Sequence, residues 1–319
     1  MKRYIIGVDI GGTNTKVALL DFGGHILHKK DFLTKSYGSD RLLDGVAKES
    51  SVILKDKSIK KTELLGLGIG LPGLVDFKRG LVFSLTNIPR WKDVKLKSIL
   101  ERKLRIPVFV DNDVKVMALA EMKYGAGKGY KDAVCLTLGT GVGGAVIING
   151  SLYRGASLVA GEIGHVPLNE NGPACNCGSF GCLEAYVGRE YFLNNVRKKL
   201  ERSPDSLAMK MAEGNLFSVT PELLQKAALK GDSIAKAAWR EMGTHIGNAL
   251  AGTVNLLNPE IIIIGGGIAG AGKILFDSIR SAVDKKSMKI QAKAVRIVKA
   301  KLGNDAGVIG AAEIVKRNL

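Results

Sequence analysis

The sequence is poor in aromatic residues, has no long apolar run and contains only four cysteines among 319 residues. Phe, Trp and Tyr make up 6% of the chain, so few rings are available for stacking on nucleic acid bases. The apolar run at 261–264 is far shorter than the roughly 20 residues of a membrane-spanning helix, and no secretory signal opens the chain. These absences argue against membrane insertion and secretion, and we expect a cytoplasmic protein.

Acidic residues are scarce relative to basic ones, because 30 Asp and Glu face 47 Lys and Arg and give a net charge of +17. Such an excess raises the question of a polyanionic partner. The lysines are spread along the chain, however, with modest clusters at 55–61 and 285–293. We therefore expect a solvated basic surface and no nucleic acid partner. An anionic substrate such as a nucleotide or a polyphosphate is compatible with this charge.

The length of the chain and its hydrophobic content of 46% allow a large core and suggest two domains around a cleft. Strands and helices are expected to alternate, which indicates an α/β protein. Strands are expected at 4–10, 15–21, 25–33, 64–71, 108–111, 133–138, 144–148, 260–264 and 295–300. Helices are expected at 39–55, 94–104, 114–124, 183–201, 207–213, 221–230, 232–257, 272–284 and 305–317.

Three of the four cysteines lie close together, at Cys175, Cys177 and Cys182, and His165 precedes them. Three thiolates and an imidazole form the ligand set of a closed, four-coordinate structural zinc site. A disulfide would leave one of these thiols without a partner, and no oxidising context supports it. Cys135 lies in an apolar run and is interpreted as a buried small hydrophobic residue. The cluster therefore predicts bound zinc.

Two glycine-rich turns join pairs of expected strands, one at 9–13 (DIGGT) and one at 139–143 (GTGVG). In both turns a threonine stands beside a glycine, so backbone N–H groups and hydroxyl groups could surround one anion. Each turn alone is also typical of a plain hairpin. Taken together, the two turns favour a phosphate site.

A third glycine-rich segment, 265–270 (GGGIAG), follows an apolar strand and precedes a helix, as in dinucleotide-binding proteins. The nearby acids Asp277 and Asp284 lie within the expected helix and not at the end of a following strand. An oxidoreductase would also leave the cysteine cluster and the other two turns without a role. We therefore favour an adenosine moiety lying against bare backbone.

Two further positions allow both a structural and a functional interpretation. Asp113 ends the run 110–113 (VDND) and could either cap the next helix or act as a general base. The segment 70–73 (GLPG) could be an ordinary turn at the end of a strand or one lip of a pocket. The residues alone leave both alternatives open.

The motifs together resemble those of the ROK (repressor, open reading frame, kinase) sugar kinases, nearly from one end of the chain to the other. Residues 9–16 (DIGGTNTK) resemble the first phosphate loop of that family, 138–141 (LGTG) the second, and 265–267 (GGG) the adenosine segment. Residues 160–165 (AGEIGH) and the pattern CxCGxxGCxE at 175–184 are similar to the signature of the family.

The resemblance implies a two-domain, actin-like and hexokinase-like ATPase fold, in which duplicated ribonuclease H-like α/β domains enclose an interdomain cleft. The smaller N-terminal domain is expected at 1–113 plus about 301–319. The larger domain is expected at 114–300 and carries the zinc loop.

The implied activity is transfer of the γ-phosphate of ATP to a hexose hydroxyl, with glucose as the favoured acceptor and Asp113 as the general base. For the sugar, the resemblance implies contacts from Gly70, Pro72, Gly73, Asn112, Asp113, Glu162, His165 and Glu184. For the nucleotide, it implies contacts from Asp9, Gly11, Gly12, Thr13, Asn14, Lys16, Gly139, Thr140, Gly141, Gly265, Gly266 and Gly267.

Two metals with different roles are expected. Magnesium is expected to accompany ATP, with Asp9 as its protein ligand. Zinc is structural and bound by His165, Cys175, Cys177 and Cys182. If one ring nitrogen of His165 binds zinc, the other is held in a fixed direction toward a sugar hydroxyl.

Several alternatives stay open beside glucose and ATP. Other hexoses (fructose, mannose, N-acetylglucosamine and N-acetylmannosamine) and polyphosphate are possible substrates, and the family resemblance suggests a homodimer. A sugar-sensing regulator is disfavoured because the phosphate loop begins at Asp9, which leaves no room for a preceding DNA-binding domain. The family commonly continues Asn-Asp with Ala-Asn, whereas this chain has Val114 and Lys115, so contacts just beyond the base are less well defined.

Overall fold

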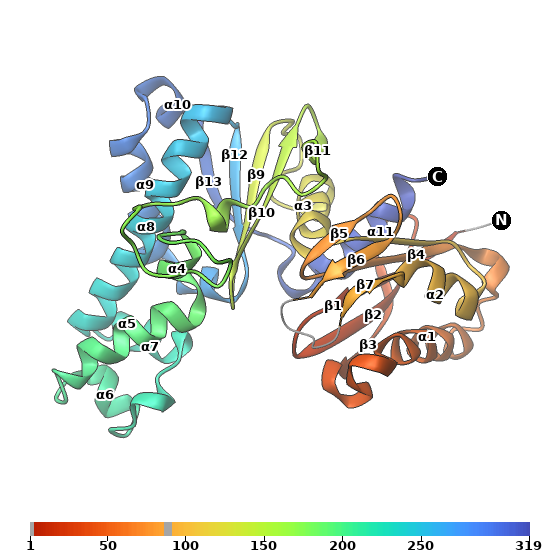
Figure 1. The fold of residues 1–319 in the computed structure, drawn as a ribbon, viewed down its shortest axis with the longest axis horizontal. Helices are drawn as coiled ribbons and strands as arrows, with labels where there is room; N and C mark the ends of the chain where they lie inside the picture. Colours follow the sequence, from red (N-terminus) through yellow and green to blue (C-terminus); the bar gives the residue numbers. More distant parts are fainter. Residues whose placement is uncertain (1–2, 86–90) are drawn as a thin grey trace. The chain divides into compact units, whose positions relative to one another are not determined.

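The computed structural model describes residues 3–85 and 91–319, which form two compact units (Figure 1). Unit 1 comprises Met1–Gly129, Leu152–Ala160 and Lys301–Leu319. Unit 2 comprises Tyr130–Ser151 and Gly161–Ala300. Residues 114–129 and 152–160, which the sequence analysis assigned to the larger domain, belong to unit 1 in this division.

The sheet of unit 1 has the strand order β3-β2-β1-β4-β8. Its first three strands form an antiparallel meander, and β4 and β8 run parallel to β1. The strands are β1 (Tyr4–Ile10), β2 (Asn14–Asp21), β3 (Ile26–Leu33), β4 (Leu64–Leu71) and β8 (Val108–Asn112).

Helices cover both faces of this sheet, and alternate residues of the strands face the two layers. Ile6 and Val8 of β1 pack in one cluster with α1 (Gly38–Asp56) and α2 (Leu96–Leu104). Ile5 packs in another cluster with α11 (Ala306–Lys316). The helix α3 (Asp113–Tyr124) packs against α11.

The helix α11 lies unusually close to the sheet. A Cβ atom added to Gly68 of β4 would lie 1.7 Å from the carbonyl oxygen of Ala311, so only glycine fits there. The helix also packs on β1 and α3, so the closing helix of the chain belongs to unit 1.

A small antiparallel sheet in unit 1 was not predicted. It consists of β5 (Leu74–Asp76), β6 (Leu81–Ser84) and β7 (Lys92–Val94). These strands are too short to give a periodic pattern, and the helix expected at 94–104 consequently begins later, at Leu96.

The second five-stranded sheet, whose strands other than β11 lie within unit 2, repeats the order of the first, as β11-β10-β9-β12-β13. As in the first sheet, β10 pairs with β9 in antiparallel fashion, β12 runs parallel to β9, and β13 runs parallel to β12. The strands are β9 (Ala133–Leu138), β10 (Val142–Ile148), β11 (Ser151–Tyr153), β12 (Ile261–Gly265) and β13 (Arg296–Lys299). The repeated order agrees with the expected duplication of α/β domains.

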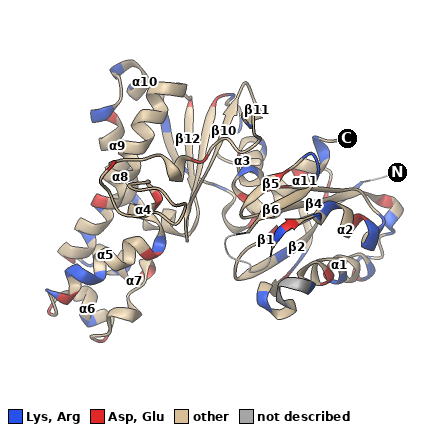
Figure 2. Ribbon diagram, viewed as in Figure 1, with Lys and Arg blue, Asp and Glu red and all other residues tan. Residues whose placement is uncertain are grey.

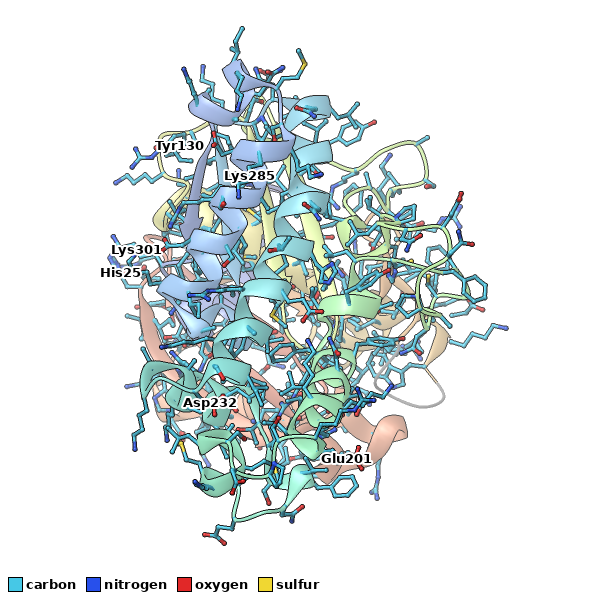
Figure 3. The ribbon with its side chains drawn as sticks, turned by 90° about the vertical axis from the view of Figure 1, so that its left-hand side faces the viewer. His25, Tyr130, Glu201, Asp232, Lys285 and Lys301 are labelled. Carbon is cyan, nitrogen blue, oxygen red and sulfur yellow. The ribbon has the colours of Figure 1, made fainter. Side chains whose placement is uncertain are left out.

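Helices dominate the rest of unit 2, and α8 lies along α9 (Figures 1 and 3). The segment expected as one helix at 183–201 is two helices, separated at Gly188, which has an extended ψ of 145°. The helices are α4 (Glu184–Val187), α5 (Arg189–Glu201), α6 (Leu207–Met211), α7 (Pro221–Leu229), α8 (Ser233–Leu257), α9 (Lys273–Lys286) and α10 (Lys289–Ala294).

The excess of basic residues is spread over the molecule. Lys and Arg are scattered over the helices and loops of each unit and do not gather on one element (Figure 2). Among the described residues, no helix combines the length and the apolarity that crossing a bilayer needs. The alternation of strands and helices predicted from the sequence is confirmed.

Candidate functional site

In unit 1, the turn from β8 to α3 carries Asn112 and Asp113. Asn112 is the N-cap of α3, because its Oδ1 accepts hydrogen bonds from the backbone N–H groups of Val114 (3.0 Å) and Lys115 (3.3 Å). Asp113 is the first residue of the helix, and its Oδ1 accepts from the backbone N–H of Val114 at 2.9 Å. The carboxylate therefore lies at the positive end of the helix dipole, which stabilises its charge.

The segment 70–73 lies beside this turn. The side-chain amide of Asn112 donates to the carbonyl oxygen of Gly73 at 3.2 Å. Gly73 has a φ of +118°, which disfavours any other residue. Of the residues predicted for the sugar, the structure thus joins Gly73, Asn112 and Asp113 into one corner of unit 1.

The β1–β2 turn carries the first glycine motif. The backbone N–H of Gly11 donates to the carbonyl of Asn14 at 2.9 Å, and the hydroxyl of Thr34 donates to the carbonyl of Gly11 at 2.7 Å. Thr34 was not singled out in the sequence, because it lies 23 residues from its partner. The hydrogen bond from Thr34, which follows β3, therefore helps to hold the β1–β2 turn in place.

Asp9 lies at the end of β1, with its carboxylate next to the first turn of α11. A Cβ atom on Gly307 would lie 2.5 Å from the carboxylate of Asp9. Lys16 places its Nζ 3.7 Å from Asp9 Oδ2 and donates to the carbonyl of Asn304 at 2.7 Å. Burial raises the pKa of Asp9, and the nearby ammonium of Lys16 only partly opposes this effect.

In unit 2, the β9–β10 turn carries the second glycine motif. The backbone N–H of Gly139 donates to the carbonyl of Gly141 at 3.0 Å. Glu184, the first residue of α4, accepts from the backbone N–H of Val142 through Oε2 at 2.8 Å. The backbone N–H of Arg189 donates to the carbonyl of Gly139 at 3.1 Å. Glu184, which the sequence predicted only as a sugar ligand, therefore holds the β9–β10 turn.

The third glycine segment follows β12. Gly266 has a φ of +87°, and a Cβ atom there would lie 2.2 Å from the carbonyl of Leu138, at the end of β9. Gly267 and Gly270 have no atom within 4 Å of the position that a Cβ would take. Packing within the chain does not require glycine at these two positions; Gly267 is exposed, whereas the carbonyl of Gly270 accepts a hydrogen bond from the side chain of Gln225 at 2.6 Å.

The acids near this segment do not fit a dinucleotide site. Asp277 lies within α9 and forms ion pairs with Lys273 and Arg280 on the same helix. It is thus engaged along the helix and not placed at the end of a strand, where an acid would meet a ribose.

Glu162 and His165 lie on a loop that packs against β10. His165 ends a short 3₁₀ turn, Ile163–His165, which Glu162 precedes. The loop approaches the strand closely, because a Cβ atom on Gly164 would lie 2.1 Å from the carbonyl of Val142. The glycines of the segment 160–165 therefore set the position of both side chains relative to the sheet of unit 2.

The four predicted metal ligands converge. The ligand atoms of His165, Cys175, Cys177 and Cys182 all lie within 4.8 Å of one another. Cys175 Sγ lies 3.8 Å from His165 Nδ1, and Cys177 Sγ lies 3.7 Å from Cys182 Sγ. Zn–S bonds of about 2.3 Å give a tetrahedron with edges of about 3.8 Å, so the spacing fits zinc.

The same distances contradict a disulfide, which needs sulfur atoms about 2.05 Å apart. All four cysteines are free. Burial raises the pKa of Cys175 to about 12 and also raises that of Cys182, while backbone hydrogen bonding lowers that of Cys177. A bound divalent cation would reverse the effect of burial on these thiols.

Comparison with known proteins gives a consistent result. The model of the ROK family matches residues 5–318. A glucokinase of Thermotoga maritima is 37% identical over 320 aligned residues, covering 100% of this chain and 99% of that protein. The crystal structure of a ROK family glucokinase from Streptomyces griseus, in complex with glucose and AMPPNP, superposes with a TM-score of 0.84 at 31% identity. The superposition covers 98% of this chain and 99% of that one.

Regulators are also similar to this chain. A xylose repressor of Caldicellulosiruptor bescii is 30% identical over 98% of this chain, but the match covers only 77% of the repressor.

Proposed function

The chain belongs to the ROK family, and we propose that it is a sugar kinase that transfers the γ-phosphate of ATP to glucose, giving glucose 6-phosphate. The similarity to glucokinases over the whole chain is the observation that carries the proposal. The local geometry of each unit supplies groups suited to this reaction.

The proposed general base is Asp113. In the reaction, the sugar hydroxyl oxygen forms a bond to the γ-phosphorus, the bond from that phosphorus to the β–γ bridging oxygen breaks, and ADP leaves. Asp113 accepts the proton that the hydroxyl loses. Asn112 uses its amide to hold the helix and Gly73, which keeps the turn that carries Asp113 rigid.

The two glycine turns and the exposed backbone at Gly267 are proposed to bind ATP. Magnesium, when bound with the nucleotide, would neutralise charge that develops on the phosphate oxygens. Asp9 fits as its protein ligand, since its side chain is 23% exposed and offers a carboxylate beside the β1–β2 turn.

The sugar ligands proposed in unit 2 are Glu162, His165 and Glu184. His165 turns its Nδ1 toward Cys175, which leaves Nε2 to bond a sugar hydroxyl. Glu184 gives Oε2 to the N–H of Val142, and we assign its Oε1 to the sugar. Zinc held by the cluster would orient His165 without contacting the substrate.

The test is an ADP-release assay with ATP and glucose, mannose, fructose, N-acetylglucosamine or N-acetylmannosamine as acceptor. We expect the highest kcat/KM for glucose and no turnover with 6-deoxyglucose, which lacks the accepting hydroxyl. Replacing ATP by polyphosphate and measuring glucose 6-phosphate tests the alternative donor. Absence of turnover with every hexose would reject the proposal.

A sugar-responsive regulator is the second candidate, because the xylose repressor is 30% identical to this chain. A gel-shift experiment with DNA separates the two functions. A shift that sugar reverses, without ADP release, would favour the regulator.

A further inference from the structure

The segment 152–160 of unit 1 is anchored beside the turn that carries Asp113 by two basic side chains. It continues directly into Gly161 and Glu162, which belong to unit 2. A short stretch of backbone therefore joins Arg154 to Glu162.

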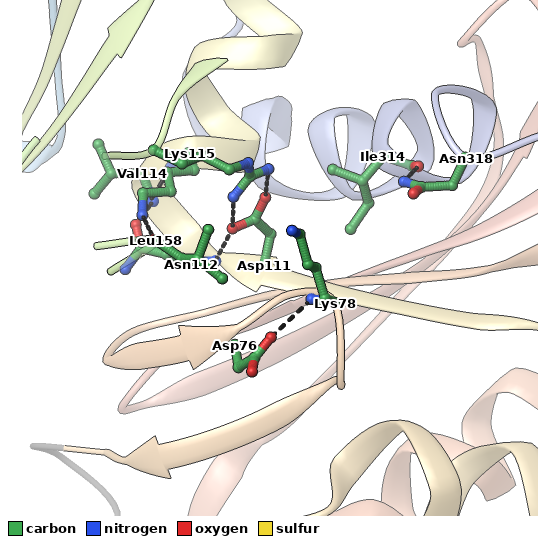
Figure 4. Close-up of polar contacts among 10 residues, drawn as sticks. Asp76, Lys78, Asp111, Asn112, Val114, Lys115, Leu158, Ile314 and Asn318 are labelled. Carbon is green, nitrogen blue, oxygen red and sulfur yellow. Dashed lines mark hydrogen bonds and ion pairs between the residues drawn. The ribbon is translucent and has the colours of Figure 1, made fainter. Parts of the chain in front are cut away.

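The first anchor is Arg154. Its guanidinium binds both carboxylate oxygens of Asp111, at 3.1 Å and 2.5 Å (Figure 4). It also stacks on the ring of Phe77, with 3.7 Å between the guanidinium carbon and the ring centroid. Such a two-pronged, stacked arrangement fixes direction as well as distance, and a lysine cannot reproduce it.

Asp111 transmits this anchor to the catalytic turn. Its side chain is only 3% exposed, and its Oδ1 accepts a hydrogen bond from the backbone N–H of Asn112 at 2.9 Å. Asn112 in turn caps α3, whose first residue is Asp113. Arg154 is therefore linked to Asp113 through a short series of hydrogen bonds, all of them within unit 1.

The second anchor is Lys115, in the first turn of α3. It is 4% exposed, and its Nζ donates to the carbonyl oxygen of Leu158 at 3.0 Å (Figure 4). Leu158 has a φ of +67°, which costs free energy for a residue other than glycine. The bond from Lys115 helps to hold this conformation, four residues before Glu162.

We propose that Arg154 and Lys115 are positioning residues for phosphoryl transfer: Arg154 orients Asp113 through Asp111, and Lys115 sets the course of the chain toward Glu162. The inference rests on the proposed sugar-kinase function. Neither residue contacts the reacting atoms in this scheme. A misplacement of about 1 Å in such a site can cost about a hundredfold in rate, so buried anchors of this kind have a measurable effect.

The test compares Arg154→Met with Arg197→Met. Arg197 is a matched control, because its side chain is 19% exposed against 18% for Arg154 and it also forms an ion pair, with Glu190. We expect Arg154→Met to lower kcat for glucose by about 10- to 100-fold, with the KM for ATP unchanged. Arg154→Lys should recover only part of the loss, and Arg197→Met should leave kcat unchanged.

Lys115→Met is compared in the same way with Lys316→Met, since Lys316 is also a largely buried lysine, whose side chain is 10% exposed. We expect Lys115→Met to raise the KM for glucose about tenfold, because Glu162 would be misplaced. The Lys316→Met variant should keep the KM of the wild type.

Hydrogen–deuterium exchange provides a measurement that does not depend on activity. The amide protons of Val114 and Lys115, which Asn112 caps, should exchange about tenfold faster in Arg154→Met and unchanged in Arg197→Met. Unchanged exchange in Arg154→Met, or a kcat within about twofold of the wild type, would overturn the role of Arg154. An unchanged KM for glucose in Lys115→Met would overturn that of Lys115. A wild-type protein that phosphorylates no hexose would reject the proposed function, while exchange would still decide whether Arg154 holds the turn.

Discussion

At the scale of single residues, Asn112 and Asp113 divide two tasks between neighbouring positions. The sequence allowed Asp113 to be either a helix cap or a base. In the structure the cap is Asn112, whose amide oxygen accepts two backbone N–H bonds. Asp113 also accepts from the N–H of Val114, but the helix keeps a cap without it, so capping alone does not account for a carboxylate at this position.

We predict that Asp113→Asn lowers kcat by about a hundredfold to ten-thousandfold, the usual cost of losing a general base. The fold should persist, because the amide oxygen of Asn can still accept from the N–H of Val114. ADP-release kinetics and thermal unfolding measure the two effects. Asp277→Asn, on the outside of α9, is the control and should keep the activity of the wild type. Near-normal turnover in Asp113→Asn would contradict the assignment.

Asp9 gives a prediction for stability and pH. Its pKa is raised above 3.8, mainly by burial, so the ionised carboxylate destabilises the folded state at neutral pH. Asp9→Asn should therefore raise the free energy of unfolding at about pH 7, and this gain should shrink as the pH falls through the raised pKa toward that of the unfolded chain.

Urea unfolding at several pH values measures this difference, and Lys16 keeps its bond to Asn304 in the variant. The same substitution should lower activity, because the proposed magnesium ligand is lost. A variant less stable than the wild type at neutral pH would contradict the dominance of burial.

At the scale of elements, the cysteine loop and α4 connect the residues that we propose for metal, sugar and nucleotide within unit 2. Cys182 is followed two residues later by Glu184, which holds the N–H of Val142 in the β9–β10 turn. Because α4 has a single turn and ends at Gly188, its position depends on the contacts on either side. The cysteine loop that precedes α4 is therefore expected to influence the positions of both His165 and Glu184.

We predict one zinc ion per chain in protein purified without chelator, measured by elemental analysis. Cys177→Ser should lose the ion and raise the KM for glucose at least about tenfold, since His165 and Glu184 would lose their anchor. Cys135→Ala is the control, because Cys135 is buried in β9 away from the cluster. Loss of zinc with an unchanged KM would show that the metal does not orient the sugar ligands.

At the scale of the whole molecule, two units repeat one strand order, and each has its own buried core. The resemblance to the ROK family implied this duplication, whereas the residue patterns alone indicated only a two-domain α/β protein. The exact division was less accessible, because α3 follows the proposed base in sequence and yet packs on α11, near the end of the chain.

Binding of glucose should stabilise the folded protein by mass action, by about 2.7 kcal/mol at a concentration of 100 times Kd. We therefore expect a higher Tm with glucose and a smaller shift with N-acetylmannosamine. The Asp113→Asn variant should retain a shift with glucose, since the proposed sugar ligands Glu162, His165 and Glu184 are unchanged. A Tm that no hexose changes would contradict the sugar site.

Patterns within short stretches of sequence predicted most of the elements and the metal cluster. The helix and strand periods are local, and Cys175, Cys177 and Cys182 lie within one loop. The sequence did not predict the short strands β5–β7, because a strand of three or four residues has no measurable period. It did not predict the break at Gly188 either, because a single glycine interrupts a helical pattern only weakly.

The sequence by itself determined the α/β class, the glycine turns and the candidate ligands, because each depends on residues close together along the chain. Only the tertiary structure decided which distant groups meet. Arg154 binds Asp111 across 43 positions, Glu184 binds Val142 across 42, and Lys115 binds Leu158 across 43. Such pairs leave no periodic pattern in the sequence, since only folding of the chain brings them together. They position the residues to which we assign substrate binding and catalysis.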